Sequence, residues 1–166
     1  MTDKEKRQEV LERLSGLEIP FELYEHTAVY TMKDIADGEE NFPEGSVVVK
    51  NLFLKEHNSE KYFLVVTTGE KHADIKSLRR FLGTKPLSFA TEAQLEEKLG
   101  VCAGAVSPLA VINDGDGTVS LIIDDELKGK LLGVHPNENT ATVFITYENL
   151  EKYAESCGKR LINMQV

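Results

Sequence analysis

A lysine interrupts the most apolar segment of the chain, VVVKNLFLKEH at residues 47–57. Burying an ammonium group without a partner costs at least ~2 kcal/mol, so Lys50 requires either access to water or a bound anion. If the segment is a regular strand, Lys50 shares a face with Val48 and Leu52, and Asn51 points to the other face. Two interpretations stay open: the stem of the lysine packs while its ammonium reaches solvent, or the lysine anchors a phosphate or a carboxylate.

Small residues dominate the segment GVCAGAVSPLAVIND at 100–114, between a predicted helix and a predicted strand. The stretch from Ala103 to Pro108 lets a ligand approach the backbone, and successive N–H groups in such a turn can bind an oxyanion. A tight connection that requires Gly and Pro for its geometry alone has the same composition. The segment therefore predicts either an oxyanion-binding loop or a structural turn.

His135 begins a third candidate segment, HPNENTATVFIT at 135–146. A residue before proline favours extended backbone, so this histidine is expected in a loop before the following strand. Asn139 and Thr140 add hydrogen-bonding groups just downstream. A loop histidine with polar neighbours can bind an amine, a hydroxyl or a proton, although a surface turn contains the same residue types.

Basic side chains gather in EKHADIKSLRR at 70–80. On a helix, Lys76, Arg79 and Arg80 project to one side because of their three- and four-residue spacing. This face could contact a nucleic-acid backbone, and a solvated helix face is the alternative.

Hydrophobic periodicity and capping patterns predict the elements that must position these residues. Expected helices cover 4–15, 31–35, 74–82, 92–99 and 147–157, and expected strands cover 21–25, 47–56, 61–68, 109–112, 118–124, 140–146 and 160–165. The turn HNSE joins the second and third strands, and NDGDG predicts a hairpin between LAVI and TVSLIID. Because the strands come in hairpins and are not regularly separated by helices, the expected class is α+β with a mixed, mainly antiparallel sheet.

Composition limits the class of protein. The 166 residues predict one domain, residues 1–166, and an apolar content of 41% is that of an ordinary globular protein. The net charge of −9 argues against sequence-independent binding to DNA or RNA. The longest apolar runs are too short to cross a bilayer. Cys102 and Cys157 lack a CxxC motif and are expected as free thiols in a reducing cytoplasm, and the scattered histidines predict no metal site.

Four segments, taken together and in this order, resemble the YbaK/prolyl-tRNA-synthetase-associated editing-domain family, in particular its free-standing ProX-type members. They are EHTAVYT (25–31), VVKNLFLK (48–55), GAVSPLAVIND (104–114) and HPNENTAT (135–142). The resemblance implies a β-barrel-like sheet surrounded by helices, with one pocket for the aminoacylated 3′ end of a tRNA. It also implies hydrolysis of a mischarged aminoacyl ester, most often Ala-tRNA(Pro) and in some relatives Cys-tRNA(Pro). The attack by water would use no metal, no cofactor and no covalent nucleophile.

The resemblance assigns roles to individual positions. Lys50, Asn51 and His135 match catalytic positions, and Lys50 is expected to hold the terminal nucleotide or the ester. A pocket floored by the small residues at 104–106 would admit alanine and exclude proline, which favours Ala-tRNA(Pro) as substrate. The positions expected to bind substrate are His26, Tyr30, Thr31, Gly104, Ala105, Val106, Ser107, Pro108, Asn139 and Thr140, and those expected to contact the tRNA backbone are Lys76, Arg79 and Arg80.

The implied partners are an aminoacylated tRNA and prolyl-tRNA synthetase, in the cytoplasm, with no membrane and no DNA. Two other classes of protein stay open at this point. One is a non-catalytic adaptor that binds a tRNA or a synthetase, and the other is a sensor of free amino acid that uses the same pocket.

Overall fold

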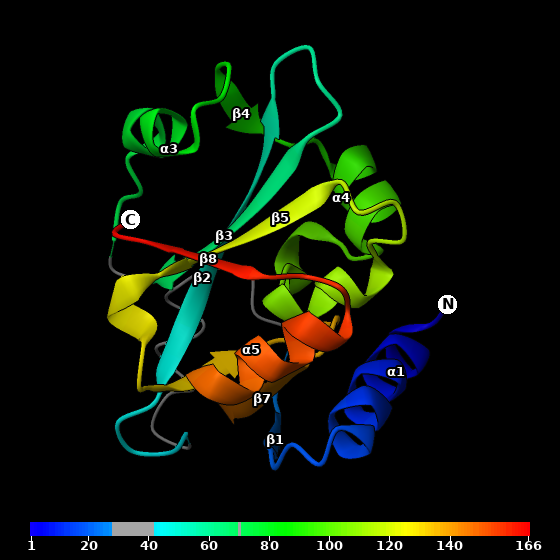
Figure 1. Cartoon of the computed structure of the whole chain (residues 1–166). Helices are drawn as coiled ribbons and strands as arrows, with labels where there is room; N and C mark the ends of the chain where they lie inside the picture. Colours follow the sequence, from blue (N-terminus) through cyan, green and yellow to red (C-terminus); the bar gives the residue numbers. More distant parts are fainter. Residues whose placement is uncertain (28–41, 70) are drawn as a thin grey trace.

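A mixed sheet with helices on both of its faces forms the framework of the protein (Figure 1). The computed structural model describes residues 1–27, 42–69 and 71–166. In chain order the elements are α1 (Asp3–Gly16), β1 (Glu22–Glu25), β2 (Val47–Glu56), β3 (Tyr62–Thr68), α3 (Ile75–Leu82), β4 (Leu87–Phe89), α4 (Glu92–Leu99), the 3-10 helices η2 (Ala103–Ala105) and η3 (Pro108–Asn113), β5 (Val119–Asp124), the 3-10 helix η4 (Asp125–Leu127), β6 (Leu131–Val134), β7 (Ala141–Thr146), α5 (Tyr147–Ser156) and β8 (Leu161–Met164).

The strands of the described residues hydrogen-bond in the order β1-β7-β6-β2-β3-β5-β8, and β4 pairs separately with β2. The pairs β1·β7, β6·β7, β2·β3 and β2·β4 are antiparallel. The pairs β2·β6, β3·β5 and β5·β8 are parallel. The α+β class and the mixed sheet predicted from the sequence are confirmed, and β2 and β3 form the predicted hairpin.

Strand β2 has different neighbours along its two edges. One edge pairs with β3 over residues 49–55. The other edge pairs with β6 only at 47–48 and with β4 only at 54–56. Among the described residues, the interval 49–52 therefore has no strand partner on that side. This interval contains the lysine and the asparagine that the sequence predicts to be catalytic.

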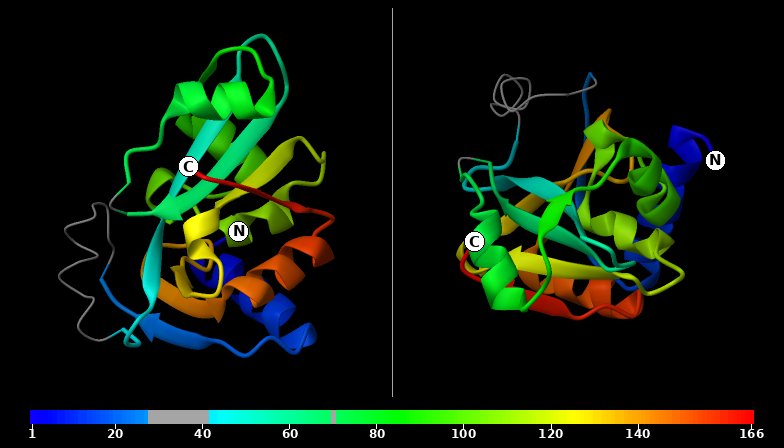
Figure 2. Two further views of the ribbon diagram at one scale, coloured as in Figure 1. Left: turned by 60° about the vertical axis from the view of Figure 1, so that its left-hand side comes forward. Right: turned by 90° about the horizontal axis from the view of Figure 1, so that it is seen from above.

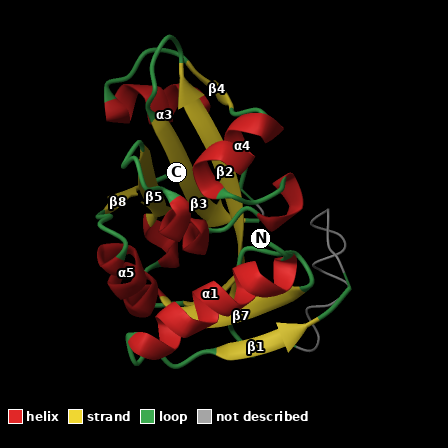
Figure 3. Ribbon diagram, turned by 90° about the vertical axis from the view of Figure 1, so that its right-hand side faces the viewer, coloured by secondary structure: helices red, strands yellow, loops and turns green. Residues whose placement is uncertain are grey.

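Alternation along β2 divides its apolar side chains between two cores. One face, with Val49 and Phe53, packs beneath α1, α4, α5 and η3. The opposite face, with Leu54, packs against Leu78 of α3. Figure 3 shows α1 lying along β7 and β1, and Figure 2 shows α3 near the end of the β2–β3 hairpin. The two cores thus use alternate residues of one strand.

Helix ends follow the capping signals in the sequence. The predicted capping box of α4 is present: the Thr91 side chain accepts from the N–H of Gln94 (3.2 Å), and the Gln94 side chain accepts from the N–H of Thr91 (2.8 Å). Asp74 begins α3 by accepting from the N–H of Ser77 (3.1 Å). Gly100 ends α4 in the left-handed conformation that glycine favours. These predicted boundaries are confirmed.

The predicted hairpin around NDGDG is wrong. LAVI lies in the 3-10 helix η3, and the next strand begins only at Val119. Pro108 starts η3 because its fixed φ suits a first helical turn, and the Ser107 side chain caps it by accepting from the N–H of Leu109 (3.1 Å). Most of LAVI is buried, and a short apolar run of this kind does not distinguish a buried strand from a buried helix.

Short segments account for the remaining differences. Strands β4 and β6, of three and four residues, were not predicted because so few residues show no clear alternation. The helix predicted at 31–35 and the substrate positions Tyr30 and Thr31 lie outside the described residues. Cys102 and Cys157 are free thiols, as predicted. In the described part of the chain, no helix is both long and apolar enough to cross a membrane.

Gly133 of β6 has no space for a side chain. A Cβ at this position would lie 2.7 Å from Cε1 of Phe144 and 3.2 Å from Cγ2 of Val48. We expect Gly133→Ala to lower the free energy of unfolding by about 1–3 kcal/mol, because overpacking forces neighbouring side chains to move. Urea denaturation measures the change, and Gly115→Ala, whose Cβ would meet nothing within 4 Å, is the control. An unchanged free energy for Gly133→Ala would contradict this packing.

Candidate active site

A small crevice opens where β2 and β6 separate. It is lined by Val48, Val49, Asn51, Gly133, Val134, His135 and Thr142. Its cavity volume is about 10 Å³. That is room for about one water. Two of the three residues predicted to be catalytic, Asn51 and His135, therefore meet in this crevice.

Asn51 has one paired and one unpaired end of its amide. Its Nδ2 donates to the carbonyl oxygen of Val106 (3.0 Å), which connects β2 to the loop at 104–108. Its Oδ1 is buried and has no hydrogen-bond partner among the described residues. A buried acceptor without a donor costs about 1–3 kcal/mol. This oxygen is therefore suited to accept a hydrogen bond from a ligand or from water.

His135 lines the crevice, and the ring of His26 lies beside that of His135, with ring centroids 6.3 Å apart. Nδ1 of His26 donates to the carbonyl oxygen of Thr27 (2.7 Å). Nδ1 of His135 donates to the carbonyl oxygen of Ala141 (3.0 Å). Both Nε2 atoms are therefore acceptors in the neutral rings. That of His26 accepts from the Thr142 hydroxyl (2.8 Å), whereas no described residue bonds to that of His135.

The environment of His135 keeps its ring neutral. Burial lowers its pKa below the ordinary value of 6.5, and the neighbouring His26 lowers it further. The hydrogen bond to Ala141 and the charge of Glu138 act in the opposite direction but do not offset the burial. At pH 7 the ring therefore offers a lone pair on Nε2 to a hydrogen-bond donor.

Lys50 lies on the opposite face of β2 from Asn51, as the predicted alternation requires. Its Nζ donates to the carbonyl oxygen of Lys71 (3.1 Å), and its side chain is half-buried. None of the ion pairs formed by the described residues includes this ammonium. At this position β2 pairs with β3 on one side and with no described strand on the other, so it is locally an edge strand from which the ammonium can reach water. Its charge is available to an anionic group of a ligand.

A buried ion pair fixes the backbone that Lys50 contacts. Asp124, fully buried at the end of β5, accepts from Nζ of Lys71 (2.8 Å) and from the hydroxyl of Thr67 (2.6 Å). The exposed Glu126 also pairs with Lys71 (3.1 Å). Burial by itself would raise the pKa of Asp124, but the hydrogen bonds from Lys71 and Thr67 outweigh it and the pKa is lowered. Thr67 is the cross-strand partner of Lys50, so one network stabilises both neighbours of the lysine.

The small-residue loop predicted to surround the substrate lies beside Asn51. Ala105, Ser107 and Pro108 are buried, and Gly104 and Val106 are half-buried. The hydrogen bond from Asn51 to the carbonyl of this loop places its backbone next to the crevice. Its contact with a substrate stays a prediction.

A buried carboxylate holds the loop that follows β6. Glu138 accepts from the N–H of Thr140 (2.9 Å) and from its hydroxyl. Arg7 of α1 donates to Glu138 through Nη2 (2.9 Å) and Nε (3.1 Å). The carbonyl oxygen of Thr140 accepts from the N–H of His26 (2.9 Å), and Asn139 is half-buried in the same loop. The side chain of Thr140 therefore helps to fix the loop.

The three basic residues predicted to contact tRNA are exposed on α3. Arg79 donates to the carbonyl oxygen of Thr84 (3.3 Å), and Arg80 donates to the hydroxyl of Ser77 (3.3 Å). Lys76 lies one turn earlier in the same helix. Their contact with tRNA stays a prediction.

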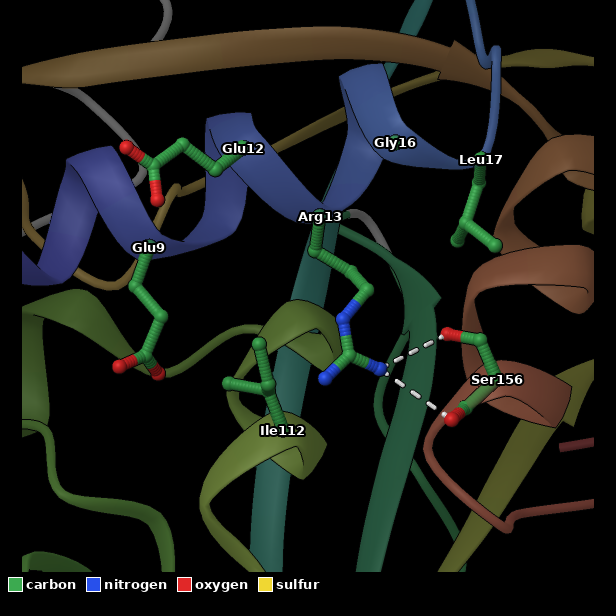
Figure 4. Close-up of a pocket in the computed structure, with 7 residues that line it drawn as sticks. All are labelled: Glu9, Glu12, Arg13, Gly16, Leu17, Ile112 and Ser156. Carbon is green, nitrogen blue, oxygen red and sulfur yellow. Dashed lines mark hydrogen bonds between the residues drawn. The ribbon is translucent and has the colours of Figure 1, made fainter.

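A wider hollow lies between α1, η3 and the end of α5 (Figure 4). It is lined by Glu9, Glu12, Arg13, Gly16, Leu17, Ile112 and Ser156. Arg13 spans it and donates to the carbonyl oxygen and to the hydroxyl of Ser156 (both 3.2 Å). None of the predicted site residues that the structure describes lines this hollow. The candidate chemistry therefore lies in the smaller crevice.

Sequence reasoning missed residues that position the site. Thr142 bonds to His26, Asp124 fixes Lys71, and Glu138 fixes the loop after β6. The available signal was weak: Asp124 ends the apolar run VSLII, and Glu138 lies within HPNENT. A carboxylate at such a position is buried only if tertiary structure supplies a partner, and the sequence does not show which residue that is.

Comparison with known proteins identifies the family. The model of the aminoacyl-tRNA editing domain matches residues 26–153. The prolyl-tRNA editing protein ProX of Acetoanaerobium sticklandii is 38% identical over 158 residues, which cover 94% of each chain. The prolyl-tRNA synthetase associated domain-containing protein 1 of Danio rerio is 34% identical over 152 residues, which cover 90% of this chain and 81% of that protein. A crystal structure of a candidate trans-editing enzyme for prolyl tRNA synthetase has the same fold, with a TM-score of 0.74 at 19% identity over 100% of this chain and 99% of the other.

The mixed sheet, with its crevice beside an asparagine and two histidines, is thus the scaffold of an editing hydrolase. The chain belongs to the aminoacyl-tRNA editing domain family. Its activity is that of an aminoacyl-tRNA deacylase, and its substrate is an aminoacylated tRNA. The family and the enzyme class predicted from the sequence are confirmed.

The buried Asp124–Lys71 pair makes a measurable contribution to stability. We expect Asp124→Asn to lower the free energy of unfolding by about 1.5–3 kcal/mol at pH 7, because Lys71 and Thr67 lose a charged hydrogen-bond acceptor. Glu126→Gln removes the exposed partner of the same lysine and is the matched control, with an expected loss below about 1 kcal/mol.

The pH dependence of this difference follows from the lowered pKa of Asp124. A carboxyl whose pKa is lower in the folded chain stabilises it fully above its ordinary pKa of 3.8, and the stabilisation is lost as the pH falls through the lower, folded value. Urea denaturation should therefore show the gap between wild type and Asp124→Asn narrowing below about pH 4. An equal gap at pH 7 and pH 3 would contradict the ion pair.

Proposed function

We propose that this chain is a trans-editing hydrolase that deacylates mischarged tRNA(Pro), with Ala-tRNA(Pro) as its substrate. The similarity to the prolyl-tRNA editing protein ProX over 94% of both chains supports the tRNA(Pro) class. The observation that carries the mechanism is the crevice between β2 and β6, where the unpaired Oδ1 of Asn51 lies beside the neutral His135.

The reaction is the attack of one water molecule on the carbonyl carbon of the aminoacyl ester. Asn51 and His135 both line a crevice with room for about one water. In the proposal this water donates its two protons to Oδ1 of Asn51 and Nε2 of His135. Its lone pair then faces the ester. The bond between the carbonyl carbon and the terminal ribose oxygen breaks, the substrate's other ribose hydroxyl relays the proton, and free amino acid and tRNA leave. Positioning of this kind is a large part of the acceleration in such reactions.

Lys50 supplies a positive charge that no described carboxylate neutralises. In the proposal its ammonium leaves the carbonyl oxygen of Lys71 and binds an anionic group of the substrate. That group is either the terminal phosphate or the oxyanion formed by the attack of water. The two differ in kinetics, because a contact made equally in the ground and transition states changes KM, whereas one made only in the transition state changes kcat.

Small residues beside Asn51 favour alanine as the amino acid. Gly104, Ala105 and Val106 add little side-chain volume next to the crevice, and Asn51 fixes the carbonyl of Val106. A pocket with such a floor takes a methyl side chain and excludes a pyrrolidine ring. A second sieve is needed because a synthetase pocket built for proline rejects a smaller residue by only ~1–3 kcal/mol.

The tRNA backbone is proposed to lie along α3. Residues 52–90 contain seven lysines and arginines against four carboxylates, whereas the rest of the chain contains 12 against 24. This basic segment includes Lys71, which contacts Lys50, and continues through the exposed residues Lys76, Arg79 and Arg80. Phosphate contacts at such a segment weaken as salt rises. Prolyl-tRNA synthetase, as the source of the mischarged tRNA, is the proposed protein partner.

Deacylation of Ala-, Cys-, Ser- and Pro-tRNA(Pro) tests the proposal directly. We expect Ala-tRNA(Pro) to be hydrolysed fastest and Pro-tRNA(Pro) not at all. Lys50→Ala should lower kcat/KM by about 10²–10³-fold, since it removes a charged contact to the substrate. Lys130→Ala, at an exposed lysine outside the basic segment, should change it less than about twofold.

Two outcomes would overturn parts of this proposal. Faster hydrolysis of Cys- or Ser-tRNA(Pro) than of Ala-tRNA(Pro) would overturn the choice of substrate. Inactivity of the wild type toward all four would replace the enzyme with an adaptor or an amino-acid sensor.

Charge reversal on α3 tests the path of the tRNA. We expect Arg79→Glu/Arg80→Glu to raise KM by about tenfold and to reduce the salt dependence of kcat/KM, with kcat nearly unchanged. Lys152→Glu/Arg160→Glu makes the same change of net charge at exposed residues elsewhere and is the control. An equal rise in KM for both double variants would remove α3 from the binding surface.

A further inference from the structure

We infer that Arg7, on the N-terminal helix α1, is a positioning residue that clamps together the two histidine-bearing segments of the site. The residue lies outside 26–153, the part of the chain that matches the editing-domain model. The kinetic consequence rests on the proposed function. The structural basis is independent of it.

One guanidinium group contacts both segments. Nη1 of Arg7 pairs with Oε1 of Glu25 (3.2 Å), the residue immediately before His26. Nη2 and Nε donate to Oε1 of Glu138 (2.9 and 3.1 Å), three residues after His135. Glu25 and Glu138 are far apart in the sequence and meet only at Arg7, so the link cannot be read from either segment alone.

The burial of Glu138 explains why the arginine matters. Only 1% of the Glu138 side chain is exposed, against 22% for Arg7. The remaining oxygen of Glu138 holds the N–H and the hydroxyl of Thr140, and Arg7 also donates to that hydroxyl (3.3 Å). A buried carboxylate that loses its charged partner must take up a proton or move toward water. Either change would release Thr140.

Thr140 transmits this restraint to the histidines. Its carbonyl oxygen accepts from the N–H of His26 (2.9 Å). The next residue, Ala141, provides the carbonyl oxygen that fixes Nδ1 of His135 (3.0 Å). The ring of His135 therefore keeps its tautomer and orientation through backbone that the Arg7–Glu138 pair stabilises. A misplacement of about 1 Å in such a group is enough to slow a reaction markedly.

Helix α1 is a rigid support for this arginine. Val10 and Leu14 are fully buried in the main core, and Figure 3 shows the helix along β7 and β1. Arg13 on the same helix instead donates to Ser156 of α5 (Figure 4), and none of its hydrogen bonds to the described residues is to a histidine-bearing segment. The chain thus contains a matched control: two arginines of one helix, each bound to a distant segment, of which only Arg7 reaches the site.

The experiment compares Arg7→Met with Arg13→Met by two readouts. The first is the NMR signals of the imidazole rings of His26 and His135 in the free protein. The second is kcat and KM for Ala-tRNA(Pro). We expect Arg7→Met to shift both ring signals and to lower kcat at least tenfold with KM changed less than threefold, and Arg7→Lys to recover part of kcat. Arg13→Met should change neither readout.

A double-mutant cycle with Glu138→Gln shows whether Arg7 acts through the buried carboxylate. We expect Arg7→Met to lower kcat much less in the Glu138→Gln background than in the wild type, because the interaction is already lost. Equal effects in both backgrounds, or ring signals that Arg13→Met shifts as much as Arg7→Met, would overturn the inference.

Failure of the clamp and failure of the proposed function give different results. If the wild type deacylates none of the four tRNAs, the proposed function fails, while the ring signals still test the clamp. If Arg7→Met does not fold, Arg7→Lys replaces it, since lysine keeps the charge but not the planar fork of donors. Unchanged ring signals in Arg7→Lys, together with unchanged kcat, would then overturn the inference.

Discussion

The divided edge of β2 is the constraint on which the site depends. One edge of the strand is paired with β3 over residues 49–55, so the strand is held firmly in the sheet. On the other edge β6 pairs only with Val47 and Val48 and β4 pairs only from Leu54 onward, so the residues between them face an opening instead of a described strand. An opening of this kind within a sheet exposes polar side chains to a ligand without exposing the core. The loop at 104–108 reaches β2 at this opening through the Asn51 amide.

Two buried carboxylates stabilise the surroundings of this opening. Asp124 fixes Lys71 and Thr67 on the face that carries Lys50. Glu138 fixes the loop on the side that carries His135. Each carboxylate is compensated by one basic residue and by further hydrogen bonds, which is the condition under which a buried charge is tolerated. None of the three catalytic candidates bonds directly to either carboxylate, and so the charge of Lys50 and the lone pairs of Asn51 and His135 are available to a substrate.

The placement of polar groups on both faces of one strand suits the proposed hydrolysis. An aminoacyl ester at the end of a tRNA has an anionic side, its phosphate, and an electrophilic carbon that needs a positioned water. Lys50 is a cation on one face of β2, and Asn51 with His135 forms a pair of acceptors at the crevice. Because the ester is already activated, positioning and charge stabilisation can carry the reaction. The acidic body and the basic segment at 52–90 would direct the tRNA toward this strand.

The sequence by itself determined the class of fold, the helices with capping signals, the β2–β3 hairpin and the family, because these depend on local periodicity and on short segments in a fixed order. It also placed Lys50 and Asn51 on opposite faces of a strand, since alternation is a local property. The sequence-based prediction failed at LAVI, where a 3-10 helix and a strand have the same apolar pattern, and at β4 and β6, which are too short to show a pattern.

Only the tertiary structure decided which basic side chain pairs with each buried carboxylate. It also decided that His26 lies beside His135 and that Arg7 reaches both of their segments. Those contacts join residues up to 131 positions apart, and no local pattern in the chain encodes such a meeting.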